Sequence, residues 1–193
     1  MSKIGISKFH YAVQSAEENA TTDATYSTTT AIPGLVSIEV NTDSTTNTLY
    51  ADNGPYETST TMGSINVTID LADLPLQDQA ALLGHTYDSS AKTLVKKTSD
   101  VAPNTAILFE FLMGNGKTLA CKLYKGKFAE VPMSGQTKGE NIEFQTNQIT
   151  ASFAALKGKA NNAGKWTYCQ EFEANASTDA FYSAPIVSAD PNS

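Results

Sequence analysis

Strict alternation of apolar and polar residues constrains the fold of this 193-residue chain more than any other feature. It is clearest in residues 64–71, where Ile65, Val67, Ile69 and Leu71 occupy every second position. Successive side chains of a β-strand point to opposite faces of the sheet, whereas a helix repeats about every 3.6 residues. This segment is therefore predicted to be a strand with one buried face and one polar face.

An earlier segment, residues 35–41, alternates in the same way and is predicted to place Val36, Ile38 and Val40 on its inner face. Beyond it, the sequence predicts a turn at 43–47, a returning strand at 48–51, a turn at Asp52–Pro55 and a loop to Gly63. Later strands are predicted at 92–97, 105–113, 118–125 and around 166–168, with a hairpin turn at Gly114–Gly116. Within 140–153 the apolar positions change from even to odd, which predicts a bulge near 145–148.

One short helix is predicted at about 74–84. Asp73 is its expected N-cap, Gly84 ends it, and Leu76, Ala80 and Leu83 form an apolar stripe. The fold class is therefore an all-β sandwich or barrel with one short helix and extended N- and C-terminal arms.

The domain organisation follows from the same patterns. Residues 1–170 are predicted to form one β domain, which includes a polar, Thr-rich loop or arm at 15–31 and whose core begins at Ile32. Residues 171–193 are predicted to be a C-terminal extension without a clear period. Its hydrophobic Phe181 and Tyr182 either dock on a neighbouring molecule or cover their own domain.

Charge is divided along the chain. No basic residue lies between Lys8 and Lys92, a stretch with 11 carboxylates, whereas residues 92–170 hold 11 lysines against five carboxylates. If the two halves occupy different faces, one copy can attract the next head to tail; two unrelated solvated surfaces are the alternative. The chain has no arginine, so we expect no tight binding of nucleic acid.

No motif for catalysis or for a cofactor is present in the sequence. His10 and His85 lack companions at metal-ligand spacing and no nucleophile motif accompanies them, so we expect no metal site and no enzyme. Cys121 and Cys169 are expected to be buried thiols, and a disulfide between them is the alternative. No leader or membrane-spanning run is evident, so the chain is expected to be soluble in the cytoplasm when made.

Several long motifs occur in one order along residues 4–168: AIPGLVSIEVN at 31–41, TLYADNGPYET at 48–58, LLGH at 82–85, YKGKF at 124–128 and KGENIEFQT at 138–146. Together they resemble the major tail proteins of siphophages that infect Gram-positive bacteria. The resemblance implies a β-sandwich of the tail-tube type that forms hexameric rings stacked into a hollow tube in the virion. It also implies assembly in the host cytoplasm, with a tape-measure protein in the lumen and tail terminator and distal tail proteins as partners. DNA would pass through without being tightly bound.

With that family in view, the polar positions of the alternating strands become candidates for the lumen: Ser37, Glu39, Asn66, Thr68, Asp70, Glu143 and Gln145. Six residues are candidates for contacts between subunits: Tyr56, Glu57, Lys122, Lys125, Phe181 and Tyr182. Two alternatives remain, namely another tail subunit such as a distal tail or tube-terminating protein, and a bacterial carbohydrate-binding or adhesive β-sandwich.

Overall fold

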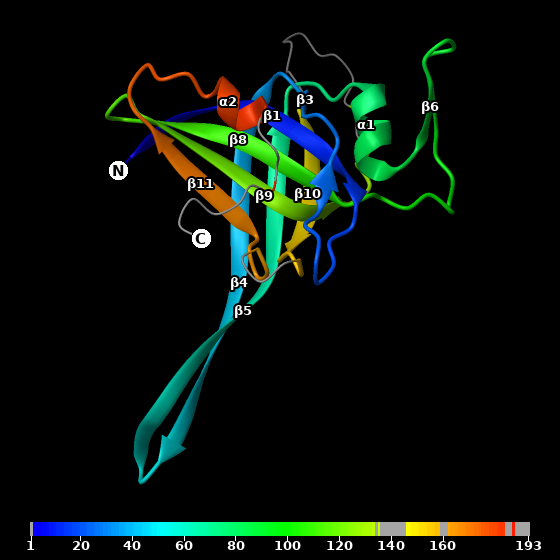
Figure 1. Ribbon diagram of the computed structural model, residues 1–193. Helices are drawn as coiled ribbons and strands as arrows, with labels where there is room; N and C mark the ends of the chain where they lie inside the picture. The colour runs from blue at the N-terminus through cyan, green and yellow to red at the C-terminus, as the bar shows by residue number, and fades with distance from the viewer. Residues whose placement is uncertain (1, 134, 136–145, 159–161, 184–186, 188–193) are drawn as a thin grey trace.

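The computed structural model describes residues 2–133, 135, 146–158, 162–183 and 187. Its strands are β1 (Lys3–Ala16), β2 (Thr25–Tyr26), β3 (Thr30–Ala31), β4 (Leu35–Ala51), β5 (Gly54–Leu71), β6 (Thr86–Asp88), β7 (Thr93–Val95), β8 (Thr105–Met113), β9 (Thr118–Phe128), β10 (Asn147–Ala154) and β11 (Thr167–Phe172). Its helices are α1 (Leu76–Leu83) and α2 (Asp179–Ser183). The all-β prediction is confirmed (Figure 1).

One antiparallel sheet contains nine of these strands. Its order is β2-β1-β8-β9-β10-β5-β4, with β11 paired to β9 and β3 paired to β1, while β6 and β7 form a separate pair. Strand β9 changes its partner along one edge, because residues 118–123 pair with β11 and residues 125–128 pair with β10. The sheet therefore curls at β9, and β8, β9 and β11 cross β4 and β5 in Figure 1.

The hydrophobic core lies inside this curl. It is formed by alternate residues of five strands: Phe9, Tyr11, Ile65, Val67, Ile69, Ile107, Phe109, Cys121, Leu123, Ile149, Ala151 and Phe153. The predicted inner face of residues 64–71 is confirmed, since Ile65, Val67, Ile69 and Leu71 are all buried. Gly126 is required for this packing, because a Cβ there would lie 2.4 Å from the Phe153 ring.

A second cluster covers the opposite face of β1, β8 and β9. There Ala12, Leu108 and Ala120 pack against Phe181 and Tyr182 of α2. This part of the sheet is buried on both faces, which explains why all of 105–110 is buried rather than every second residue. The prediction of a single helix was wrong, since α2 is a second helix that lies against the sheet (Figure 1).

The prediction that the core begins at Ile32 was also wrong. Strand β1 pairs with β8 along most of its length and buries Phe9, Tyr11 and Ala12. Its register shifts between Ser7 and His10, where Lys8 takes a positive φ of 54°. This bulge interrupts the alternation that marks a strand in sequence.

Helix α1 differs from its prediction at the start and agrees at the end. Pro75, not Asp73, is the N-cap, and no side chain caps the helix. Gly84 ends it with a left-handed φ of 75°, as expected. The buried side is rotated, because Leu82 lies in the core while Leu76 is exposed.

The predicted loop or arm at 15–31 is tied to the domain. It contains β2 and β3, and the Tyr26 hydroxyl donates a hydrogen bond to the Tyr124 carbonyl at 2.9 Å. The Glu18 carboxylate accepts hydrogen bonds from Lys125 Nζ at 2.7 Å and Gln14 Nε2 at 3.0 Å, and only 2% of its side chain is exposed. Burial alone would raise the pKa of Glu18, but these hydrogen bonds outweigh burial and lower it from 4.5 to about 2.

This ion pair predicts a component of acid sensitivity. A carboxylate with a lowered pKa in the folded state stabilises the fold above its unfolded pKa of 4.5, and loses that contribution as the pH falls toward 2. We expect Glu18→Gln to lower the free energy of unfolding by about 3 kcal/mol at pH 7, and by much less at pH 2.5. Urea unfolding at both pH values measures this, with Glu17→Gln at the exposed neighbouring position as control. An equal loss for Glu18→Gln at both pH values would contradict it.

Candidate assembly site

The β4–β5 hairpin extends far beyond the body of the sheet (Figure 1). We call its distal part, residues 44–62, the hairpin arm. Here β4 pairs only with β5, from Ser44 opposite Met62 to Ala51 opposite Gly54, because β10 pairs with β5 only from Ile65 onward. Asp52 and Asn53, with φ of 51° and 65°, form the tight turn at the end.

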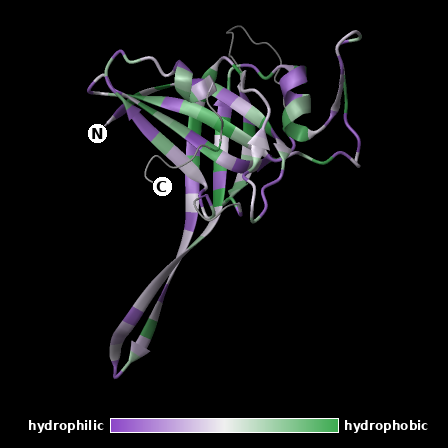
Figure 2. Cartoon of the chain, viewed as in Figure 1, coloured by the Kyte–Doolittle hydropathy of each residue, from purple (hydrophilic) through white to green (hydrophobic). Residues whose placement is uncertain are grey.

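The hairpin arm replaces two predicted features, the turn at 43–47 and the loop to Gly63. Both segments are strand. Both of their faces are exposed, and none of residues 44–62 is buried, so the alternation that marks a half-buried strand is absent. Figure 2 shows hydrophobic colours gathered in the body and pale colours along most of the hairpin arm.

Large apolar side chains are nevertheless exposed on the hairpin arm. Leu49, Tyr50, Tyr56 and Met62 are 59, 71, 72 and 47% exposed. Within the hairpin arm, the threonine hydroxyls of Thr46 and Thr60 approach each other at 3.0 Å across the strands. An isolated two-stranded hairpin is marginally stable in water, so the hairpin arm is suited to being covered by another molecule.

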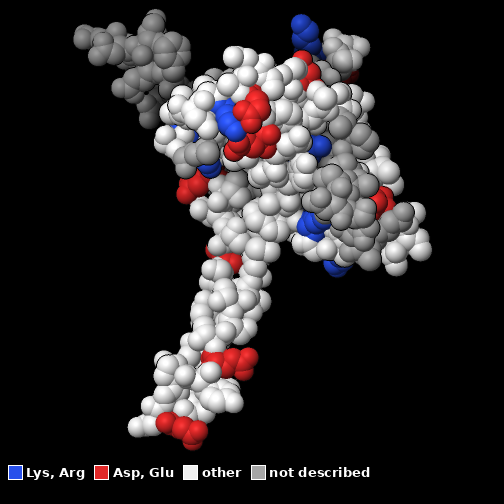
Figure 3. Space-filling model, turned by 60° about the vertical axis from the view of Figure 1, so that its left-hand side comes forward, with Lys and Arg blue, Asp and Glu red and all other residues white. Residues whose placement is uncertain are grey.

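Unpaired strand edges accompany these side chains. Strand β4 ends the strand order, so its outer edge has no partner among the described strands. The hairpin arm carries the carboxylates of Asp52 and Glu57 and no lysine, and Figure 3 shows acidic groups along it. Such an edge is a template for pairing with a further strand.

The outer face of β4, β5 and β10 is polar, and we call it the polar face. Register aligns its nine residues in three rows: Ser37–Asp70–Gln148, Glu39–Thr68–Thr150 and Asn41–Asn66–Ser152. Paired residues of adjacent strands point to the same side of the sheet, so these side chains form one continuous surface. It lies on the opposite side of the sheet from the core residues Val67, Ile69 and Ile149.

Carboxylates organise this surface. Asp70 accepts hydrogen bonds from Ser37 Oγ at 2.5 Å and from Gln148 Nε2 at 3.0 Å. Glu39 accepts one from Asn41 Nδ2 at 3.0 Å. The neutral donors are directed toward the carboxylates, and the nine residues include no cation, so the polar face is net negative.

A lysine borders the polar face. Lys127 of β9 is the register partner of Ser152, and it lines a shallow hollow of about 340 Å³ together with Asn66, Thr68 and Thr150. The lysine-free first half of the chain supplies two of the three strands, but the third comes from the lysine-rich half. The two halves are therefore not separated onto different faces.

Five of the seven lumen candidates lie together on the polar face: Ser37, Glu39, Asn66, Thr68 and Asp70. That this face lines a channel stays a prediction. Glu143 and Gln145 lie outside the described residues. Of the bulge predicted near 145–148, Asn147 and Gln148 pair with β5 without a register shift. Gln148, Thr150 and Ser152 were missed, although the odd apolar positions of β10 place them on the same side.

The candidates for subunit contacts divide into two groups. Tyr56 and Glu57 are exposed on the hairpin arm. Lys122, Phe181 and Tyr182 are buried in their own chain, so in this conformation they are not available to a neighbour. The Lys122 ammonium lies 4.4 Å from the centre of the Phe181 ring, and burial lowers the pKa of Lys122. Lys125 is engaged by Glu18, as described above.

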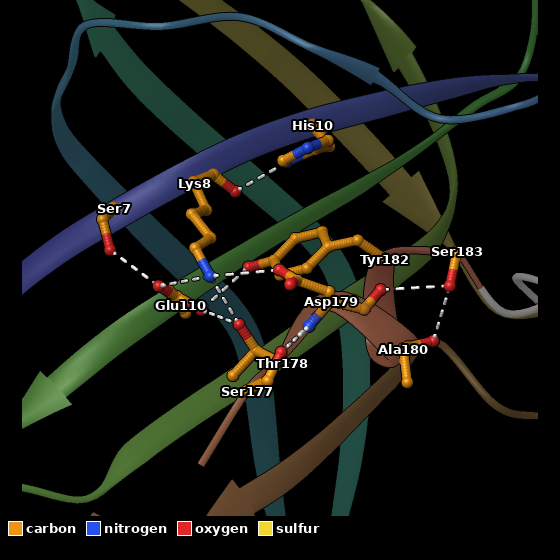
Figure 4. A network of polar contacts seen from close by, with 10 residues as sticks. All are labelled: Ser7, Lys8, His10, Glu110, Ser177, Thr178, Asp179, Ala180, Tyr182 and Ser183. Atoms are coloured by element: carbon orange, nitrogen blue, oxygen red, sulfur yellow. Dashed lines mark hydrogen bonds and ion pairs between the residues drawn. The ribbon is translucent and has the colours of Figure 1, made fainter. Parts of the chain in front are cut away.

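A buried carboxylate holds α2 against the sheet (Figure 4). Glu110 of β8 accepts hydrogen bonds from Ser7 Oγ at 2.9 Å, Thr178 Oγ1 at 2.9 Å and the Tyr182 hydroxyl at 3.4 Å. Lys8 Nζ lies 3.7 Å from it. Burial and the negative charge of Glu110 raise the pKa of Tyr182. The C-terminal extension is therefore docked on its own domain at residues 178–183, the second of the two alternatives.

Both histidines have structural contacts. The centre of the His10 ring lies 4.4 Å from the centre of the Tyr182 ring. His85 Nδ1 lies 2.8 Å from Asp100 Oδ2, and its Nε2 lies 2.7 Å from Glu130 Oε1 without hydrogen-bond geometry. Within the described residues, no group of His, Cys, Asp or Glu is arranged to hold a metal ion. None of the helices in the described ranges is long and apolar enough to cross a membrane.

Comparison with known proteins gives a distant likeness to solved structures and none to a family or a curated protein. No protein-family model and no curated protein matches the chain. Among solved structures, the chain is similar to the anti-feeding prophage cap (AFP tube terminating cap) determined by cryo-EM, with 10% identity and a TM-score of 0.44. The match covers 85% of this chain and 88% of that one. At this level the likeness carries no argument about function, which rests on the hairpin arm and the polar face.

Proposed function

We propose that this chain is a structural subunit of a phage tail that assembles with further copies of itself into stacked hexameric rings, forming the tail tube. The hairpin arm carries this proposal. It exposes Leu49, Tyr50, Tyr56 and Met62 on a two-stranded extension without a core of its own, which a neighbouring molecule would cover. The motifs that resemble those of the major tail protein family indicate that this neighbour is a second copy of the same chain.

Self-assembly follows from the geometry of such a contact. The hairpin arm differs from any surface on the body, so an arm-to-body contact is heterologous and repeats from copy to copy. The free edge of β4 can add a strand from the adjacent subunit, which would join the sheets of a ring into a continuous barrel. Neither role requires catalysis, and we propose no enzymatic activity.

The polar face is suited to line the channel of this tube. DNA in transit must not bind tightly, and the carboxylates of a polar face that includes no cation repel phosphate. A tape-measure protein would occupy the same channel before ejection, and terminator and distal tail proteins would contact the tube ends. The mature protein would then reside in the virion.

Electron microscopy of the purified protein tests the proposal against its nearest alternative. Long tubes of the width of a phage tail support a tube subunit. Closed single rings would instead indicate a tube-terminating or distal tail protein, and particles that remain monomeric at high concentration would contradict assembly altogether.

Charge reversal on the polar face gives a functional prediction. We expect Glu39→Lys combined with Asp70→Lys to leave tubes intact, because both side chains are on the outer surface of the sheet, and to slow genome ejection by on the order of tenfold. The added lysines would attract the phosphates of the moving DNA. The matched control is Glu39→Gln with Asp70→Asn, which removes the charges without adding cations. DNA release from particles carrying each variant is the measurement, and ejection at the same rate in both variants would refute a channel location.

A further inference from the structure

Two cysteines face each other across β9 and β11. Cys121 is the register partner of Cys169, and their sulfur atoms lie 2.6 Å apart. Both are free thiols in the structure. Cys121 packs in the core as an apolar side chain, but neither the fold nor the proposed assembly uses the thiol chemistry of the pair.

The strand register favours a covalent link at this position. The Tyr124 N–H donates to the Trp166 carbonyl at 3.2 Å, which marks a hydrogen-bonded pair in the β9–β11 ladder. Hydrogen-bonded and non-hydrogen-bonded pairs alternate along an antiparallel ladder. Cys121 lies three positions from Tyr124 and so belongs to a non-hydrogen-bonded pair with Cys169. The Cα atoms of such pairs are about 4.5 Å apart, within the range that a disulfide spans without backbone movement.

The two thiols differ in environment. Cys169 is exposed, whereas Cys121 is buried among the core residues. The Cys121 thiol can donate a hydrogen bond to the Cys169 thiolate, which lowers the pKa of Cys169 from 9.0 to about 7 against the opposing effect of burial. The same contact, together with burial, raises the pKa of Cys121. Cys169 is therefore the accessible nucleophile, and Cys121 is the sulfur positioned behind it.

We propose that Cys121 and Cys169 form a redox modification site that reacts with small-molecule disulfides and closes into a cross-strand disulfide. The Cys169 thiolate attacks one sulfur of the small disulfide, forming a mixed disulfide and releasing one small thiolate, which takes up a proton. Cys121 then loses its proton and attacks Cys169 Sγ, so that the second small thiolate leaves and is protonated. The two cysteines lose two electrons as their disulfide forms, and the small disulfide gains the same two electrons and becomes two thiols.

Closure links β11 covalently to β9. The bond joins residues 48 positions apart, and β11 leads directly to the segment that carries α2. Cross-linking a loop of this length restricts the unfolded chain. We expect the oxidised protein to melt roughly 5–10 °C above the reduced protein.

The test is incubation of the reduced, folded full-length protein with oxidised glutathione, followed by intact mass spectrometry and thermal unfolding. Wild type is expected to lose the mass of two hydrogen atoms and to melt at the higher temperature. Cys121→Ser is expected to retain one glutathione on Cys169, because no second thiol displaces it. Cys169→Ser is expected not to react while folded, since Cys121 is buried.

Three outcomes would overturn the proposal. These are a glutathione adduct that persists on wild type as it does on Cys121→Ser, a disulfide between two copies of the chain, and two free thiols after incubation. The melting temperature of Cys169→Ser with and without glutathione controls for effects of the oxidant elsewhere.

Discussion

Replacing Tyr50 and Tyr56 with serine is expected to abolish self-assembly while leaving the subunit folded. Both rings are more than two-thirds exposed on the hairpin arm and contribute nothing to the core. An aromatic side chain buried at the centre of an interface contributes about 2 kcal/mol or more to association. Loss of two such contacts weakens each subunit contact by roughly a thousandfold.

Sedimentation and electron microscopy of the purified variant measure this effect, and circular dichroism reports whether the subunit is folded. The matched control is Val95→Ser with Val101→Ser, which removes two exposed apolar side chains, 48 and 72% exposed, away from the hairpin arm. We expect the control to assemble like wild type. Tubes of the tyrosine variant at wild-type concentration would show that the hairpin arm does not hold subunits together.

Glu110→Ala is expected to lower the free energy of unfolding by about 3 kcal/mol, because it leaves buried hydrogen-bond donors without their acceptor. It removes the acceptor shared by Ser7, Thr178 and Tyr182. The Thr178 and Tyr182 side chains would remain buried without that partner. Helix α2 should then detach more readily from the face of β8 and expose the apolar cluster beneath it.

Urea unfolding measures the loss of stability, and limited proteolysis detects release of the C-terminal segment. Glu171→Ala is the matched control, because Glu171 pairs with Lys117 on the surface and such pairs contribute about 0–1 kcal/mol. Similar losses in the two variants would contradict a clamping role for Glu110.

The success of prediction from sequence depended on how each strand is buried. Residues 64–71 have one buried and one polar face, so alternation located the strand and the core residues on it. The continuation of the same strand through 55–63 has two exposed faces and no alternation, so the sequence wrongly predicted a loop there. For this reason, the alternation of apolar and polar residues could not predict the strands of the hairpin arm, which is the feature with the greatest bearing on function.

The sequence also could not predict which side chains are buried by elements that are distant along the chain. Lys122 was predicted to be a candidate for contacts between subunits, but its strand is covered by α2, which is distant in sequence and places the Phe181 ring over the ammonium group. Local alternation identified the polar positions of β4 and β5, but Val36, which was predicted to face inward, is 52% exposed beside the register shift between Leu35 and Ser37. For β10, Gln148, Thr150 and Ser152 required the register with β5, which only the folded sheet provides.

A cryo-EM reconstruction of the assembled protein tests both surfaces at once. It should show the hairpin arm packed against a neighbouring subunit, with Tyr50 and Tyr56 buried in that contact. The polar face of β4, β5 and β10 should line the central channel. A hairpin arm that projects into solvent, or a polar face on the outside of the assembly, would contradict the proposed role as a tail-tube subunit.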